Sequence, residues 1–247
     1  MDDFKGFTLA EVLVTLGIIG VVATMTMPSL IMGYQKKQTA IQLKKAYSEL
    51  YQAVKVAEKD YGTMDGWDFT DYSTSLEKTK AFAIDYLFPN IKIIKSCIPF
   101  TNECWADNVT QLAGGRIEDF DTHIEKGVSF ITASGYSVYC WLHADGTGGW
   151  FWVDLNGLKK PNIVGKDVFP LLLTFSQPSI TNCPLGVNTK LGLFPLGAAC
   201  ETLYDRDYLL NETRYACNKD NSLGYAGAFC GALIMFDGWE IKSDYPW

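Results

Sequence analysis

The longest apolar stretch of the chain covers residues 7–35 and holds one charged residue, Glu11. It exceeds the roughly 20 apolar residues that a helix needs to cross a bilayer. In lipid, a single segment satisfies its own backbone polar groups only as a helix. The pattern therefore predicts one membrane-spanning helix, with a kink or local unwinding near residues 26–28, where Pro28 removes a helical hydrogen bond.

After residue 35 the apolar positions become one-sided. They recur at steps of three and four, as on the apolar face of an amphipathic helix: Leu43, Tyr47, Leu50, Val54, Ala57 and Tyr61. Gly62 follows this stripe and is suited to end a helix. We therefore predict that the helix continues over residues 36–62 and packs its stripe on a folded domain.

The remaining chain changes from helical to strand-like patterns. Residues 63–127 are predicted to be a connecting region, with a short helical pattern over 76–87. Four later segments are rich in β-branched and aromatic residues and are separated by turn residues: 128–132, 136–143, 150–155 and 168–175. We predict an antiparallel meander packed on the amphipathic helix, which is an α+β fold.

Composition and cysteine spacing indicate an anchored globular domain over residues 63–247. The net charge of −7 and the 48% of hydrophobic residues exclude a disordered tail and a basic nucleic-acid binder. All seven cysteines follow residue 96 and none forms a C-x-x-C, so disulfides in an oxidising compartment are favoured over a metal site. The simplest local pairs, with other connectivities open, are Cys97 with Cys104, Cys183 with Cys200, and Cys217 with Cys230. Cys140 then remains as a buried thiol, and residues 177–247 form a cysteine-rich part.

The basic residues near the apolar stretch point to the opposite orientation. Lys36, Lys37, Lys44 and Lys45 outnumber Lys5, so the positive-inside tendency places the domain in the cytoplasm. The cysteines indicate an oxidising compartment instead. We follow the cysteines and expect the domain outside the cytoplasmic membrane.

The chain begins with a motif that places a cleavage site before the apolar stretch. Its residues are Lys5-Gly6-Phe7-Thr8-Leu9-Ala10-Glu11-Val12. A cut between Gly6 and Phe7 leaves the apolar segment on the mature protein, unlike the cut of a secretory signal peptide. It also creates a positive amine on Phe7, one helical turn from Glu11. A carboxylate at the centre of a membrane helix costs about 2.5–3.5 kcal/mol, so Glu11 is expected to have a partner.

This motif resembles the prepilin processing site of type IV pilins and type II secretion pseudopilins. The resemblance implies a leader over residues 1–6, cleavage after Gly6 by a prepilin peptidase, and N-methylation of Phe7. It also implies that Glu11 neutralises the terminal amine of a neighbouring subunit during assembly. Two alternatives remain open: an ordinary signal peptide cut after Ala23, and a membrane anchor that never assembles.

Residues 154–167, from Asp154 through Asn156 to Asp167, resemble a D-x-N-G-x-x-x-P-N-x-x-G-x-D loop of many pilin-like proteins. The side chains of these three residues carry oxygens of the kind that binds Ca²⁺. The spacing differs from an EF-hand loop. A network of Asx turns explains the same residues as a tight connection. We take the Asx network as the default and Ca²⁺ as the alternative, and we expect no other cofactor.

The sequence contains no G-x-S-x-G, H-E-x-x-H or Walker A motif, and its two histidines, His123 and His143, lie apart. We therefore expect a non-enzymatic structural subunit of a type II secretion pseudopilus or a type IV pilus. The large, cysteine-rich domain favours a minor or tip subunit. Its partners would be other pilin or pseudopilin subunits, the prepilin peptidase, the inner-membrane assembly platform and the membrane, with no nucleic acid. The alternative is a membrane-anchored extracytoplasmic binding module that does not polymerise.

Overall fold

The structure is a computed structural model that describes residues 6, 8–69, 71–117, 126–176, 189–200, 205–212, 214–220 and 224–247. The chain divides into two compact units, Met1–Gln38 and Thr39–Trp247. Helix α1, Leu9–Tyr61, runs through both. The helix therefore contributes a separate N-terminal unit and one element of the domain.

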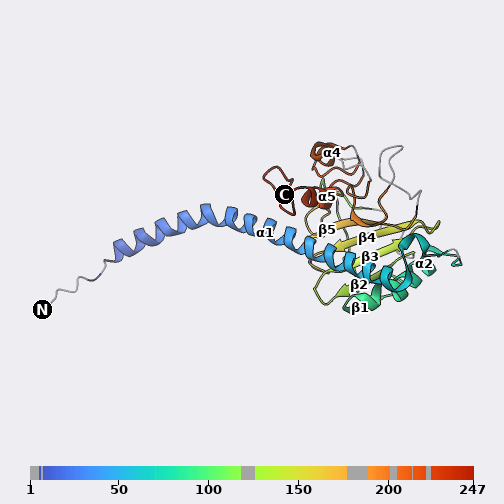
Figure 1. The fold of residues 1–247 in the computed structure, drawn as a ribbon. Helices are drawn as coiled ribbons and strands as arrows, with labels where there is room; N and C mark the ends of the chain where they lie inside the picture. Colours follow the sequence, from blue (N-terminus) through green and yellow to red (C-terminus); the bar gives the residue numbers. More distant parts are fainter. Residues whose placement is uncertain are drawn as a thin grey trace. The chain divides into compact units, whose positions relative to one another are not determined.

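The domain is built on a six-stranded antiparallel sheet in which every strand pairs with the next one along the chain (Figure 1). Its strands are β1 Ile93–Cys97, β2 Val128–Thr132, β3 Ser137–Leu142, β4 Gly148–Asp154, β5 Val168–Thr174 and β6 Gly192–Pro195. The predicted α+β, pilin-like fold is confirmed. The sequence pattern located β2 to β5 but missed the two edge strands, because β1 is largely exposed and β6 is only four residues long.

The domain half of α1 packs on the sheet through small residues. Its buried positions are Ala40, Leu43, Ala46, Leu50, Ala53, Val54 and Ala57. Four of these seven positions are alanines. The predicted stripe was wrong at Tyr61, which is 55% exposed. Tyr47 is only partly buried, and its hydroxyl donates a hydrogen bond to the Leu193 carbonyl of β6 at 3.2 Å.

Helix α1 continues without a break through Pro28. The predicted unwinding near residues 26–28 is therefore wrong. A proline removes one backbone donor, but the rest of the helical ladder persists on both sides. Hydroxyl groups beside Pro28 also stay within the helix, since Thr26 donates to the Val22 carbonyl at 2.9 Å and Ser29 donates to the Thr26 carbonyl at 2.9 Å.

The chain between α1 and β1 forms a helical connection, which covers part of the sheet. It comprises the 3₁₀ turn η1 Met64–Gly66, helix α2 Ser75–Ala81, the π-helical turn η2 Phe82–Leu87 and the 3₁₀ turn η3 Phe88–Asn90. Thr74 and Glu77 form a capping box that starts α2. Thr79 Oγ1 accepts a hydrogen bond from the Leu142 backbone N–H at 2.8 Å, which ties α2 to β3.

Aromatic side chains pack on both faces of the sheet. On one face, Phe151 of β4 meets Phe82 of η2 edge to face, with ring centroids 6.0 Å apart. On the other, Tyr139 of β3 contacts Phe100 and Trp105, with centroids 4.9 and 6.1 Å away. Strand β5 is buried along its whole length. This strand therefore has no solvent-facing side.

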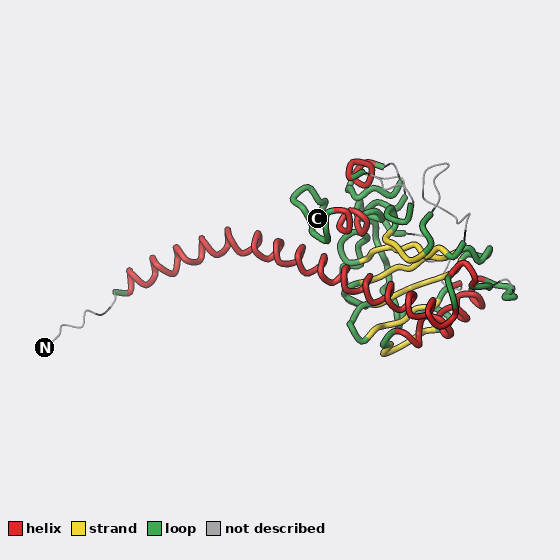
Figure 2. The backbone as a smooth tube through the Cα atoms, in the orientation of Figure 1, coloured by secondary structure: helices red, strands yellow, loops and turns green. Residues whose placement is uncertain are grey.

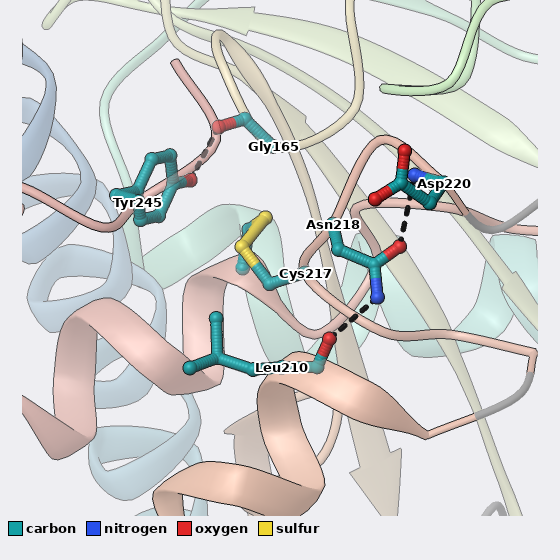
Figure 3. The surroundings of a disulfide bond; sticks show 7 residues. Gly165, Leu210, Cys217, Asn218, Asp220 and Tyr245 are labelled. Carbon is teal, nitrogen blue, oxygen red and sulfur yellow. Dashed lines mark hydrogen bonds between the residues drawn. A yellow bond between two sulfur atoms is a disulfide. The ribbon is translucent and has the colours of Figure 1, made fainter.

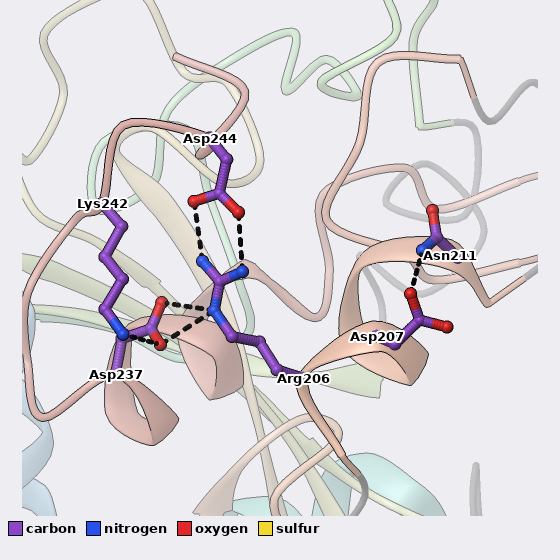
Figure 4. Close-up of polar contacts among 6 residues, drawn as sticks. All are labelled: Arg206, Asp207, Asn211, Asp237, Lys242 and Asp244. Atoms are coloured by element: carbon purple, nitrogen blue, oxygen red, sulfur yellow. Dashed lines mark hydrogen bonds and ion pairs between the residues drawn. The ribbon is translucent and has the colours of Figure 1, made fainter.

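The C-terminal part contains two short helices, α4 Arg206–Asn211 and α5 Cys230–Phe236, with loop and turn between them (Figure 2). Arg206 of α4 bridges two later carboxylates: its Nε donates to Asp237 Oδ1 at 2.9 Å, and Nη1 and Nη2 donate to Asp244 at 2.6 and 2.7 Å (Figure 4). Lys242 adds a contact to Asp237 at 2.8 Å. This charge cluster fixes residues 237–247 against α4.

A disulfide and a buried tyrosine hold the end of the chain. Cys217 is bonded to Cys230, so the loop after α4 is linked to the start of α5. Tyr245 is 4% exposed, and its hydroxyl donates a short hydrogen bond to the Gly165 carbonyl (Figure 3). The C-terminal segment is thus attached to the loop that precedes β5.

Replacing Leu50 should destabilise the domain, whereas replacing Ile41 on the same helix should not. Leu50 is fully buried, so Leu50→Ala leaves a cavity and is expected to lower the free energy of unfolding by about 2–5 kcal/mol. Ile41 is 58% exposed, and Ile41→Ala is expected to change it by less than about 0.5 kcal/mol. Chemical unfolding of the full-length protein in detergent measures both. Equal effects would contradict the packing of α1 described here.

Acid should loosen residues 237–247. Hydrogen bonds from Arg206 lower the pKa of Asp244. Burial raises the pKa of Asp237, but Arg206 and Lys242 outweigh it and leave that pKa below its usual value. Carboxylates with lowered pKa values stabilise the fold above their ordinary pKa and lose this contribution as the pH falls through the folded pKa.

The hydrogen-exchange protection factors of residues 237–247 should therefore fall below about pH 4. In Arg206→Gln they should already be low at neutral pH. Lys95→Gln breaks a surface ion pair with Glu103 instead and serves as the control. Protection in Arg206→Gln that matches the wild type would show that the charge cluster does not hold this segment.

Candidate functional site

The first turn of α1 is closed by a reciprocal pair of side chains. The Thr8 backbone N–H and hydroxyl both donate to Glu11 Oε2 at 2.8 Å, and the Glu11 N–H donates to Thr8 Oγ1 at 3.3 Å. This is a capping box, in which two residues satisfy the free donors at a helix start. Gly6 is exposed, and Phe7 lies outside the described residues. Glu11 thus has a partner within its own chain.

The sequence analysis pairs Glu11 with a terminal amine and does not name Thr8 as its partner. The signal was present, because Thr8-Leu9-Ala10-Glu11 has the T-x-x-E spacing of a capping box. A carboxylate held in this way accepts backbone and hydroxyl donors without needing water. It remains close to the N-terminus of the helix, where the helix dipole favours negative charge.

The other threonine and serine hydroxyl groups of the apolar segment are also satisfied by their own helix. Thr15 donates to the Val12 carbonyl at 3.0 Å, and Thr24 donates to the Val21 carbonyl at 2.8 Å. Thr26 and Ser29 make the similar bonds described above. Polar groups that are bonded within one helix do not oppose its transfer into lipid.

The same segment exposes a continuous apolar surface. The large apolar side chains that are exposed along it are Leu9, Val12, Leu13, Val14, Leu16, Ile18, Ile19, Val21, Val22, Met25, Met27, Leu30, Ile31 and Met32. The helix is long and apolar enough to cross a membrane, and its most apolar window has no part buried within the structure. Such a surface is stable only against lipid or against other apolar helices.

The connection between β4 and β5, residues 154–167, is a compact loop that we call the Asx loop. Asp167 Oδ2 accepts from the Asn156 Nδ2 amide at 2.8 Å and from the Asn162 N–H at 2.9 Å. Asp167 Oδ1 accepts from the Ile163 N–H at 2.6 Å. Asp154 Oδ1 accepts from the Asn156 N–H at 3.1 Å, which is an Asx turn. The structure therefore brings together all three residues singled out in this loop.

Several oxygens of this cluster have no hydrogen-bond donor. The buried oxygen atoms that lack a partner in and beside the Asx loop are Ser137 Oγ, Asp154 Oδ2, Asn156 Oδ1 and Asn162 Oδ1. Asp154 is fully buried and Asn162 is 4% exposed. Sequence reasoning did not select Asn162 or Ser137. Asn162 lies within the sequence motif of residues 154–167. Ser137 lies outside it and is brought beside the loop only by its pairing opposite Asp154 in the sheet.

The two carboxylates of the loop lie in an environment that disfavours their charge. Burial and the nearby Asp167 raise the pKa of Asp154 to about 8. Burial also raises the pKa of Asp167, although the N–H groups that it binds oppose the shift. Among the described residues, no three His, Cys, Asp or Glu side chains gather into a metal site, so any cation in this loop must also use amide oxygens.

The loop supports the C-terminal segment through Gly165. This residue has a φ of +86°, and a Cβ atom there would lie 2.8 Å from Cys230 Sγ. Glycine is therefore required both by the backbone conformation and by the disulfide packed against it. Because the Gly165 carbonyl also accepts from Tyr245, the Asx loop contacts the Cys217–Cys230 disulfide region and the chain end together.

The other cysteines that the structure describes are either disulfide-bonded or buried as a free thiol. Cys97 is bonded to Cys104, which closes a short loop after β1. Cys200 is disulfide-bonded, and its predicted partner Cys183 lies outside the described residues. Cys140 is a free, fully buried thiol whose pKa is raised by burial.

Neither histidine carries an argument for catalysis. His143 is 2% exposed and lies against the Trp141 ring, with centroids 5.1 Å apart. His123 lies outside the described residues. The absence of enzymatic activity stays a prediction. It is supported by the N-terminal segment, which resembles that of structural fibre subunits.

Comparison with known protein families gives one match for each of two parts of the chain. Residues 1–27 match the prokaryotic N-terminal methylation motif, the prepilin-type cleavage and methylation signal of type IV pilins and pseudopilins. Residues 29–247 match a family of unknown function (DUF6613). No curated protein and no solved structure matches the chain. The chain therefore belongs to this family of unknown function, and its N-terminus is that of a type IV pilin-like protein.

Proposed function

We propose that this protein is a structural subunit of a type II secretion pseudopilus or a type IV pilus. The observation that carries the proposal is the methylation motif over residues 1–27, within which a helix with an exposed apolar surface begins at Leu9. Prepilin peptidase removes residues 1–6 and methylates Phe7. One helix then holds the subunit in the cytoplasmic membrane with its domain outside, until the assembly platform adds it to a fibre.

The capping box suggests how Glu11 behaves before and during assembly. In the single chain, Glu11 Oε2 accepts two hydrogen bonds from Thr8. A carboxylate oxygen has further lone pairs, so Glu11 can bind the terminal amine of another subunit while the box persists. The amine and carboxylate would attract each other strongly in a water-poor environment. The box thus presents the charge at a fixed position on the helix.

The features of the domain favour a minor or tip subunit over a bulk subunit. Disulfides link Cys97 to Cys104 and Cys217 to Cys230, and each typically contributes about 2–4 kcal/mol to stability. They brace regions of turn and loop that have little regular structure. Such bracing suits a domain that works outside the cytoplasm and carries mechanical load or contacts at a fibre end.

The mature protein should begin at Phe7 and carry one methyl group on its terminal amine. Intact-mass and N-terminal sequence analysis of protein purified from its native membranes measures this. Gly6→Leu should block processing, because the peptidase reads the residue before the cut, and should leave Met1 in place. A mature terminus at Thr24 would indicate an ordinary signal peptide, and a wild-type terminus at Met1 would indicate an unprocessed anchor.

Removing the charge of Glu11 should abolish assembly, whereas removing its cap should not. Glu11→Gln keeps a capping-box side chain but loses the charge. It should lower incorporation into sheared fibres by tenfold or more, equivalent to about 1.4 kcal/mol per subunit contact. Thr8→Val removes the hydroxyl and keeps the charge, so its incorporation should remain within about threefold of wild type, given that a cap contributes only about 1 kcal/mol.

The same pair of variants separates a fibre subunit from an anchored binding module. Immunoblots of the membrane and fibre fractions should show that both variants accumulate in the membrane at wild-type levels. If Glu11→Gln also assembles or supports secretion like the wild type, the role of Glu11 is only to cap the helix. The anchored binding module would then replace the proposal.

A further inference from the structure

The Asx loop concentrates hydrogen-bond acceptors where no donor reaches them. Asp154 Oδ2, Asn156 Oδ1 and Asn162 Oδ1 are all buried without a partner. Each buried polar atom that stays unsatisfied costs about 1–3 kcal/mol, and a charged one costs more. Three such atoms in one loop of an otherwise well-bonded cluster therefore suit a ligand that accepts electron pairs.

The orientation of the two amides is fixed by their other contacts. Asn156 Nδ2 donates to Asp167 Oδ2 at 2.8 Å, and Asn162 Nδ2 donates to the Asp107 carbonyl at 3.0 Å. Turning either amide over would place its oxygen against another oxygen. The amide oxygens of Asn156 and Asn162 must therefore face away from these acceptors.

The charge of the loop has no counter-ion within the described part of the chain. No basic side chain pairs with Asp154 or Asp167 there, and no basic residue contributes to the electrostatic environment of either carboxylate. Asp167 lies close enough to Asp154 to disfavour the charge of the Asp154 carboxylate. A divalent cation would balance both.

We propose that the Asx loop binds a divalent cation of the Ca²⁺ type through Asp154 Oδ2, Asn156 Oδ1 and Asn162 Oδ1. Ca²⁺ accepts 6–8 oxygen ligands in flexible geometry, including Asp and Asn side chains, backbone carbonyls and water. Asp167 positions the ligands, because its oxygens already accept three N–H groups. This ligand set replaces Asp167, expected from the sequence alone, with Asn162.

Ser137 provides a further buried oxygen beside the site. It lies opposite Asp154 in the β3–β4 pairing, and side chains of directly opposite residues share one face of a sheet. A Cβ atom built on Gly157 would lie 3.7 Å from Ser137 Oγ, so this hydroxyl also borders the turn of the Asx loop. The site is thus bounded by the sheet on one side and by the loop on the other.

The experiment is a titration of the full-length protein in detergent, stripped with EGTA, with Ca²⁺ alone. Calorimetry should give a saturable, stoichiometric heat. Ca²⁺ at about 100 times its Kd should raise Tm by about 5–10 °C, because it binds the folded loop and not the unfolded chain. The absence of both a saturable heat and a Tm shift at millimolar Ca²⁺ would overturn the proposal.

Asp154→Asn tests the site itself and is nearly isosteric. It should weaken Ca²⁺ binding at least tenfold and, in EGTA, have a Tm equal to or above that of the wild type, since it replaces a buried carboxyl group whose charged form is disfavoured. Asp145→Asn is the matched control, because Asp145 also forms an Asx-type turn, through Thr147, but lies exposed in the β3–β4 hairpin.

The control should bind Ca²⁺ like the wild type. If Asp154→Asn and Asp145→Asn respond alike, the heat comes from elsewhere and the proposal fails. If Asp154→Asn does not fold, the wild-type titration still decides, because a chain whose Asp154 holds only a proton or a water would show no response to Ca²⁺. None of these outcomes depends on fibre assembly, so they test the cation site separately from the proposed function.

Discussion

The change in how apolar side chains are distributed around α1 is the constraint on which the rest of the protein depends. From Leu9 to Met32 they surround the helix, and from Ala40 to Ala57 they occupy one side. The first arrangement is stable where water is excluded from all sides of the helix, as in a membrane or in a bundle of helices. The second buries one side of the helix within the domain, through Leu43, Leu50, Val54 and four alanines. One helix therefore has to suit two environments: an apolar environment along its N-terminal part and the folded domain along its later part.

The domain compensates for a modest amount of regular structure with specific long-range links. Short connections join β2 to β3 and β3 to β4, but the other strands are joined by longer segments, and the C-terminal part has two helices of only six and seven residues. Arg206, the Cys217–Cys230 bond and Tyr245 each join segments that local structure would leave independent. These three kinds of interaction add to the hydrophobic core, to which α5 contributes Ala232, Leu233 and Ile234.

The sequence predicted those elements whose signal is local and periodic. The apolar helix, its amphipathic continuation and strands β2 to β5 follow from spacing alone, and the capping box of Thr8 and Glu11 was readable in the same way. Features set by tertiary contact were not readable. Asn162 acquires its orientation from Asp107, Ser137 from its sheet partner, and Tyr245 from a glycine in a distant loop. Edge strand β1 lacks alternation because it has little to bury.

The buried position of Cys140 has a consequence for how the chain is oxidised. With seven cysteines, at least one must remain without an intramolecular partner. Cys140 lies in the middle of β3, opposite Phe151, where an oxidant or a second thiol has no route to its sulfur. In the folded protein, Cys140 can therefore form a disulfide only if this part of the sheet first opens.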